Sequence, residues 1–177
     1  MYFKRLNATL ELPDKFDVQL SHQYPHSGGA LKYYNLRGGD VASAVARALS
    51  RVFIKQLTPS ITYATLSDTP VFPPHFDDGP STAINFYLRT NKERTVFYSR
   101  KYGAIPYRLT PAHIDNLYHK EDLVEQYSFA ASTGDCYLLN VAEVHAIESV
   151  DVDHINRSFI SCYFSEPYDV VVSNLRG

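Results

Sequence analysis

The sequence has few features of an exported, membrane-bound or disulfide-stabilised protein. It contains two cysteines, no tryptophan and no apolar run near the roughly 18 residues that a membrane-spanning helix needs. Cys136 and Cys162 do not form a Cys-x-x-Cys metal motif, so we expect free thiols in a reducing compartment. The first residues lack the apolar core of a signal peptide. These absences predict a cytoplasmic protein with no membrane segment.

The sequence also lacks a strong excess of either charge. Its 17 basic and 19 acidic side chains give a formal net charge of -2. The molecule as a whole is therefore not an electrostatic trap for nucleic acid or anionic membrane, although a local basic patch would still permit nucleic-acid binding. The 177 residues contain no repeat or long linker, which predicts one domain over residues 1–177. The oligomeric state stays open.

The spacing of apolar residues predicts one helix and several short strands. Residues 41–53 place their apolar side chains on one helical stripe, with Asp40 as the expected N-cap. A second, short helix is expected from Thr110-Pro111 to Leu117 or Tyr118. Alternating or β-branched segments typical of strands occur at residues 61–66, 83–88, 95–99, 136–140 and 157–164.

The order of these elements favours a β-rich fold. A helix-bearing part up to about residue 58 precedes closely spaced strands from about residue 59 to 170. The first 40 residues show poor periodicity and several turn signals. The many tyrosines and phenylalanines, 14 and 10, suit the half-buried walls of a β-rich domain. This organisation predicts a sandwich or barrel rather than a parallel α/β sheet.

A His-x-Asp pair is the first chemically informative motif. Pro73-Pro74 precede His75 and Asp77, and Gly79 follows them. Side chains two residues apart in an extended chain point to the same face, so the imidazole and the carboxylate could bind one ion together. Taken alone, the segment is more often a surface loop. Asp78 is expected to point away from such a site.

Two later residues strengthen the metal-site interpretation. His145 ends a strand-turn pattern, and twelve residues later Arg157 begins an apolar strand. Taken singly, such a histidine is usually a core residue and such an arginine a surface charge. Here both follow the His-x-Asp pair at plausible distances along the chain.

Together these residue types suit iron-dependent oxygen chemistry. Two neutral imidazoles and one carboxylate occupy one face of Fe(II) and leave its other positions open for O2 chemistry. The co-substrate 2-oxoglutarate would chelate the iron through its keto-acid end, and its far carboxylate would need a bidentate cation such as Arg157. Ser161, on the same strand face as Arg157, could add a hydroxyl donor.

The ordered set of motifs resembles the 2-oxoglutarate/Fe(II) oxygenase superfamily, in particular its prolyl-hydroxylase-like branch and its short phage-type members. The resemblance covers about the last 60 % of the chain and implies a mostly β fold with supporting helices around a double-stranded β-helix, or jelly-roll, core. The matching segments are residues 74–77, 83–88, 95–98, 134–140, 144–147 and 157–161.

The resemblance implies a role for each site residue. His75, Asp77 and His145 are the expected iron ligands, and Arg157 with Ser161 the expected 2-oxoglutarate anchor. In this superfamily the strand after the His-x-Asp pair supplies a tyrosine that reaches the 2-oxoglutarate carboxylate. Tyr87 is the matching residue, and Asn85 lies on the same strand face. A Gly-Gly pair that is frequent before the next strand is replaced by residues 89–94.

Three functions remain in view. The first is an oxygenase that converts 2-oxoglutarate to succinate and hydroxylates a second substrate, which the sequence leaves open among a peptidyl side chain, an amino acid and a nucleobase. The second is a non-catalytic jelly-roll binding or structural module that retains the metal site. The third, a related halogenase, would generally need a small residue in place of Asp77.

Other charged and aromatic residues have weaker claims. His22, His26, His113, His119 and His154 are expected at the surface or in packing, and Asp68 and Asp135 in turns. The stretch from Arg89 to Arg108 interleaves cations with tyrosines. It suits an anionic or planar substrate, although a solvated hairpin would have the same composition.

Overall fold

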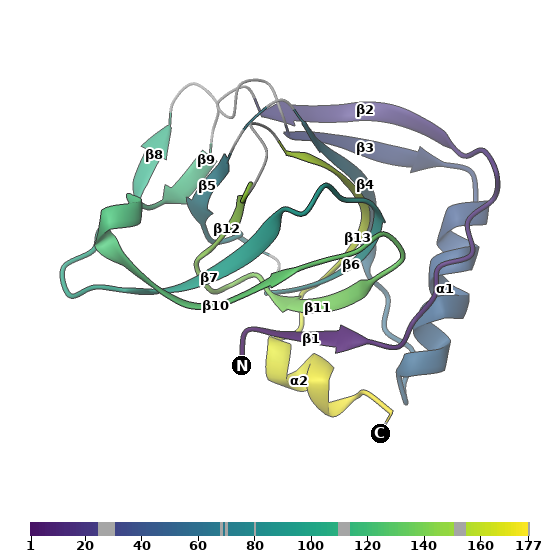
Figure 1. Ribbon diagram of the computed structural model, residues 1–177. Coiled ribbons are helices and arrows are strands. Elements are labelled where there is room, and N and C mark those ends of the chain that lie inside the picture. The colour runs from purple at the N-terminus through teal and green to yellow at the C-terminus, as the bar shows by residue number, and fades with distance from the viewer. Residues whose placement is uncertain are drawn as a thin grey trace.

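Two antiparallel sheets form the molecule (Figure 1). The computed structural model describes residues 1–24, 31–67, 69, 71–79, 81–109, 114–150 and 155–176. The seven-stranded sheet has the order β1 (Phe3–Leu6), β11 (Cys136–Asn140), β6 (Thr82–Arg89), β13 (Asn156–Phe164), β4 (Ser60–Ser67), β3 (Leu31–Arg37) and β2 (Asp17–Tyr24). The six-stranded sheet has the order β10 (Leu123–Ala130), β7 (Arg94–Arg100), β12 (His145–Glu148), β5 (Val71–His75), β9 (Ile114–Leu117) and β8 (Tyr107–Leu109).

The path of the chain between the sheets is that of a double-stranded β-helix. The chain passes from β4 to β5, from β6 to β7, and again from β11 to β12 to β13, changing sheets each time. The resulting central orders are β11-β6-β13-β4 in one sheet and β10-β7-β12-β5 in the other. This confirms the mostly β, jelly-roll fold expected from the sequence.

Side chains of the seven-stranded sheet alternate between two environments. Ile84, Phe86, Ile160 and Cys162 pack in one buried cluster with helix α1 (Asp40–Val52) and helix α2 (Tyr168–Ser173). Their neighbours along the strands face the opposite sheet and line the space between the two sheets. The period-two alternation of β6 and β13 thus separates a core-forming face from a pocket-lining face.

Helix α1 confirms the apolar stripe predicted from the sequence. Val41, Ala44, Val45, Ala48 and Leu49 are all buried. The expected N-cap is wrong by one residue, because Gly39 caps the helix and Asp40 is its first residue. Asp40 makes no capping hydrogen bond, but it lies in the first turn, where its negative charge interacts favourably with the helix dipole.

Other expectations are incomplete or wrong. The first 40 residues, which showed poor periodicity, contain β1, β2 and β3, and these strands extend the seven-stranded sheet. The short helix expected up to Leu117 is instead strand β9 where the structure describes it, since Ile114–Leu117 pairs with β5 and β8; Thr110, Pro111 and His113 lie outside the described residues. The 3-10 helix η2 (Lys120–Asp122) follows β9.

Two further sequence features have clear outcomes. Cys136 and Cys162 are free, as expected, and both are buried. Neither helix of the described part of the chain combines the length and apolarity that crossing a membrane requires.

Candidate metal centre and adjoining pocket

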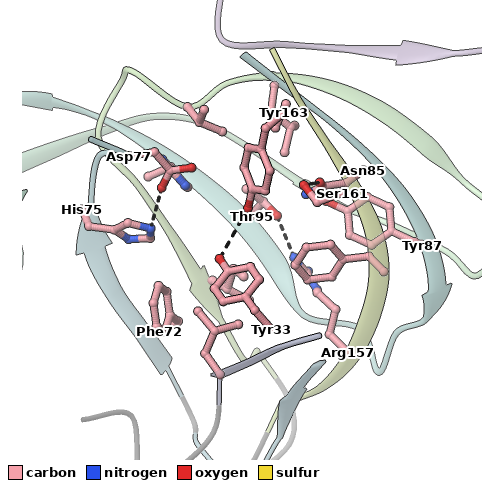
Figure 2. Close-up of a pocket in the computed structure, with 17 residues that line it drawn as sticks. Tyr33, Phe72, His75, Asp77, Asn85, Tyr87, Thr95, Arg157, Ser161 and Tyr163 are labelled. Carbon is pink, nitrogen blue, oxygen red and sulfur yellow. Dashed lines mark hydrogen bonds and ion pairs between the residues drawn. The ribbon is translucent and has the colours of Figure 1, made fainter. Parts of the chain in front are cut away.

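A pocket between the two sheets gathers the residues that the sequence singled out (Figure 2). His75, Asp77 and His145 line it from the end of β5, the following loop and the start of β12. Strand β6 contributes Asn85 and Tyr87, and β13 contributes Arg157 and Ser161. His75 and Ser161, 86 positions apart in the chain, therefore share one cavity.

The His-Asp-His group has the geometry of a metal site. One ligand atom from each of His75, Asp77 and His145 lies within 4.8 Å of the other two. Nε2 of His75 is 3.5 Å from a carboxylate oxygen of Asp77, and the rings of His75 and His145 are 4.4 Å apart between centroids. Strand pairing places His75 opposite His145. Two imidazoles and one carboxylate are a donor set suited to Fe(II).

Backbone carbonyls orient both imidazoles. Nδ1 of His75 lies 2.9 Å from the carbonyl oxygen of Pro73, and Nδ1 of His145 lies 2.9 Å from that of Glu143. A carbonyl oxygen only accepts, so each Nδ1 carries a proton, and in the neutral imidazole this leaves the lone pair on Nε2. Metal-binding histidines are commonly fixed in this way by a second hydrogen bond. The residues present therefore fit a metal ion bound through two Nε2 atoms and Asp77.

The same surroundings favour the protonation states that bind metal. Burial lowers the pKa of His145 to about 4, and the neighbouring His75 adds to the shift. Burial alone would raise the pKa of Asp77, but its contacts with the adjacent His75 and His145 imidazoles hold the pKa below its ordinary value. At neutral pH, His145 is thus neutral and Asp77 is anionic.

Arg157 is a buried cation in the same pocket. Its side chain is 1 % exposed. Nη1 donates to Oγ1 of Thr95 over 2.9 Å, and Nη2 donates to the carbonyl oxygen of Glu93 over 3.0 Å. The guanidinium carbon lies 5.2 Å from the centre of the Tyr87 ring. These contacts use two of the five N–H groups of the guanidinium.

Unpartnered donors occur beside this guanidinium. Four buried side-chain polar atoms in the described part of the chain have no hydrogen-bond partner, and two of them, the Tyr87 hydroxyl and Arg157 Nε, belong to residues that line the pocket. A buried donor without a partner is costly, and a ligand in the pocket can complete the Tyr87 hydroxyl, whereas Arg157 Nε faces the Glu93 carboxylate at 3.8 Å. Both atoms can donate to an anion.

Asn85 and Ser161 face each other across paired strands. Ser161 donates its hydroxyl hydrogen to Oδ1 of Asn85 over 2.7 Å, and both residues are buried. This bond leaves the amide nitrogen of Asn85 as a further donor in the pocket wall. The structure thus brings together all seven residues that the sequence selected, with the three potential ligands and the arginine in one cavity.

The sequence did not single out several other pocket residues. Tyr33 of β3 and Tyr163 of β13 have hydroxyl oxygens 3.4 Å apart, and Figure 2 shows their rings between His75 and Tyr87 in this view. Thr95 and Phe72 also line the cavity. Tyr163 could have been found, because it continues the alternation of Arg157 and Ser161. Tyr33 comes from a segment without clear periodicity.

Where the structure describes the other residues considered in the sequence, they lie outside this pocket. Asp78 is exposed and is not part of the His-Asp-His group. His119 is exposed and stacks on Tyr107, with 4.5 Å between ring centroids. Asp135 pairs with Arg5 and accepts a hydrogen bond from the backbone of Ser132, as expected of a turn residue. His26, His113, His154 and Asp68 lie outside the described residues.

The cations between Arg89 and Arg108 are not in the pocket. Among the described residues that line it, none is a lysine, and Arg157 is the one arginine. Arg94 instead pairs with Glu125 and Glu148. Arg100 donates to the Tyr118 hydroxyl. A contact of this stretch with a second substrate would therefore lie outside the cavity that contains His75.

Comparisons with known proteins give structural similarity only. No protein-family model and no curated protein matches the chain. A crystal structure of E. coli ycfD has a TM-score of 0.46 at 12% identity, covering 93% of this chain and 42% of that chain. A 2OG-Fe(II) oxygenase-family oxidoreductase from Burkholderia pseudomallei has a TM-score of 0.41 at 12% identity, with coverages of 88% and 75%. A Pseudomonas putida prolyl-4-hydroxylase has 0.38 at 11%, with coverages of 82% and 78%.

These likenesses are too distant to assign an activity. Each TM-score is below 0.5, and the chain spans less than half of the ycfD chain.

Proposed function

We propose that the chain is an Fe(II)- and 2-oxoglutarate-dependent oxygenase. In this reaction the oxidative decarboxylation of 2-oxoglutarate to succinate is coupled to hydroxylation of a second substrate. The observation that carries the proposal is one cavity that contains both a His-Asp-His group and a buried arginine with unpartnered donors beside it.

His75, Asp77 and His145 would hold the iron. The two Nε2 lone pairs and the carboxylate would supply three donors, a set that leaves an Fe(II) ion able to take a chelating co-substrate and O2. Bound Fe(II) would supply the redox chemistry that lets O2 react with an organic substrate. The protein contributes the orientation of the ligands, through the carbonyl oxygens of Pro73 and Glu143.

Arg157 and Tyr87 would hold the far carboxylate of 2-oxoglutarate. A carboxylate accepts several hydrogen bonds, and the Tyr87 hydroxyl and the unused guanidinium N–H groups can supply them. Asn85 and Ser161 add polar groups to the same wall. Because this wall is buried, the pairing would be little weakened by water or salt.

The second substrate would approach from the more exposed side of the metal site. The Asp77 side chain is 23% exposed, against 12% for His75. A peptidyl side chain, a free amino acid and a nucleobase all remain candidates, and the pocket residues do not distinguish among them. Nucleic acid is therefore retained as a possible partner class, and a cytoplasmic location remains a proposal.

A non-catalytic jelly-roll module that binds metal is the second candidate. The presence of the carboxylate ligand Asp77 disfavours the halogenase alternative, because halogenases generally have a small residue in its place. The unpartnered Tyr87 hydroxyl beside the Arg157 guanidinium favours the oxygenase over a simple metal-binding module, since a bound metal alone would leave this hydroxyl without an acceptor.

A succinate-release screen tests the proposal. Purified chain would be supplied with Fe(II), 2-oxoglutarate and O2, together with peptides, amino acids or oligonucleotides, and any hit would be identified by mass spectrometry. We expect succinate in wild type, none with His75→Ala, and wild-type yield with the control His119→Ala, whose imidazole is exposed outside the pocket. Metal binding without succinate in any condition would favour the non-catalytic module.

A further inference from the structure

A fully buried glutamate lies directly against the proposed anchor arginine. Glu93 is 0% exposed and precedes β7, and one of its carboxylate oxygens is 3.8 Å from Nε of Arg157. A buried carboxylate is rare unless it is paired and hydrogen-bonded. Glu93 does not line the pocket, so it can affect a ligand there only through a neighbour such as Arg157.

The Glu93 side chain joins two separate segments. One carboxylate oxygen accepts from the backbone N–H of Asn91, and the other accepts from the backbone N–H of Asn156, each over 2.7 Å. Asn91 lies in the turn between β6 and β7, whereas Asn156 begins β13 and directly precedes Arg157. The carboxylate is therefore fixed relative to the strand that carries the arginine.

The backbone of Glu93 and the side chain of Thr95 complete the arrangement. Nη2 of Arg157 donates to the carbonyl oxygen of Glu93, and Nη1 donates to Oγ1 of Thr95. Both nitrogens at the end of the guanidinium are thus held, one from β7 and one from the residue that precedes it. A guanidinium recognises a carboxylate through its planar, fork-shaped set of N–H groups, so its orientation decides how well it binds.

We propose that Glu93 and Thr95 form a clamp that positions Arg157 for the far carboxylate of a 2-oxo dicarboxylate. This inference rests on the proposed function. Glu93 also compensates the arginine charge while the pocket holds no anion, since an uncompensated buried charge strongly destabilises a fold. Both residues are positioning residues, because they act through the guanidinium.

The other reading of Glu93 is a purely structural one. Its two backbone hydrogen bonds would stabilise the turn before β7 and the start of β13 whatever Arg157 does. The clamp makes a different prediction, because it affects only ligands that engage Arg157. Two ligands that share the keto-acid end and differ in the far carboxylate separate the two roles.

The experiment measures ligand affinity by calorimetry on protein loaded with Mn(II), with 2-oxoglutarate and with 2-oxopentanoate, which lacks the far carboxylate. Glu93→Gln should raise the Kd for 2-oxoglutarate about tenfold or more, the scale on which loss of an orienting partner weakens a site. The Kd values for 2-oxopentanoate and for Mn(II) should not change. Glu93→Asp, which keeps the charge, should recover part of the affinity.

Glu148→Gln is the matched control. Glu148 is also a buried carboxylate, paired with Arg94 and Lys120, but it does not line the pocket or contact Arg157. Its loss should leave both Kd values unchanged. If Glu93→Gln does not fold, Thr95→Val carries the same comparison, because it removes only the hydroxyl that accepts from Nη1.

The outcomes separate the two proposals. Equal weakening of both ligands, or an unchanged Kd for 2-oxoglutarate, would overturn the clamp and leave the oxygenase proposal standing. Failure of wild-type protein to bind 2-oxoglutarate at all would overturn the proposed function, and the clamp with it.

Discussion

Replacing Arg157 by glutamine tests the co-substrate site in quantitative terms. The arginine is buried, with two of its five N–H groups bound to Thr95 and Glu93. Glutamine is neutral and can keep at most part of these contacts. Truncating one partner of a buried charge pair costs about 2–5 kcal/mol, much of it from the partner left unpaired. At about 1.4 kcal/mol per factor of ten, the Kd for 2-oxoglutarate should rise from about 30-fold to several thousand-fold.

The same change has a separate cost in stability. It leaves Glu93, which is 0% exposed, without its cation. Breaking a buried pair costs about 3–5 kcal/mol, and the two backbone N–H groups that still bind Glu93 should keep the loss near the lower end. The free energy of unfolding should therefore fall by about 3 kcal/mol, measured by denaturant titration.

Calorimetry on metal-loaded protein separates the two effects. Metal affinity should be retained in Arg157→Gln, because the arginine is not part of the His-Asp-His group. Arg94→Gln is the control: it removes an arginine that pairs with Glu125 and Glu148 outside the pocket, and 2-oxoglutarate affinity should not change. An Arg157→Gln protein that folds and binds 2-oxoglutarate as tightly as wild type would refute the anchor role.

Further predictions concern the metal ligands, pH, the core and the substrate side. His75→Ala and His145→Ala should each abolish tight Fe(II) binding in equilibrium dialysis while the circular dichroism spectrum is kept. Burial lowers the pKa of His145 from 6.5 to about 4, so between pH 6.5 and about 4 the unfolded chain binds a proton at this residue and the folded, metal-free chain does not. The free energy of unfolding of the metal-free protein should therefore fall by about 3 kcal/mol as the pH falls through this range. His145→Gln should remove most of this pH dependence of stability in acid titrations. Leu49→Ala, in the buried stripe of α1, should cost about 2–5 kcal/mol of stability and leave Fe(II) affinity unchanged in dialysis. Arg100→Glu with Lys101→Glu should lower hydroxylation of the second substrate, while succinate formation without coupling persists; an unchanged rate and salt response would remove this stretch from the substrate site.

The central strands and α1 could be predicted because their signals are local. Burial on one face imposes a period of two on β6 and β13 and a period near four on α1, and these periods are visible in the sequence. Strand β10 gives no such signal, since most of its residues are exposed and pairing with β7 holds it in place. Strand β5 contains Pro73 and Pro74, which argue against a strand. Strand β9 was missed because Thr110-Pro111 is a local signal for the start of a helix, whereas the strand forms by pairing with β5.

The candidate site could also be predicted in part from local patterns in the sequence. Strand alternation correctly places Asn85 with Tyr87, and Arg157 with Ser161, on pocket-lining faces. The role of Glu93 could not be predicted, because its burial depends on the turn before β7 and on Arg157, which lies on a strand far away in the sequence. Such pairings depend on tertiary contacts, which one sequence does not encode in any local pattern.

An anaerobic titration tests the central claim most directly. Metal-free protein would be titrated with Fe(II) and then with 2-oxoglutarate, with bound iron and bound 2-oxoglutarate counted after dialysis. We expect one Fe(II) per chain, held through His75, Asp77 and His145, and one 2-oxoglutarate that binds tightly only to the iron-loaded protein. The assignment would be contradicted if His75→Ala and His145→Ala bound iron as tightly as the wild type. It would also be contradicted if 2-oxoglutarate bound with the same affinity in the presence and absence of iron.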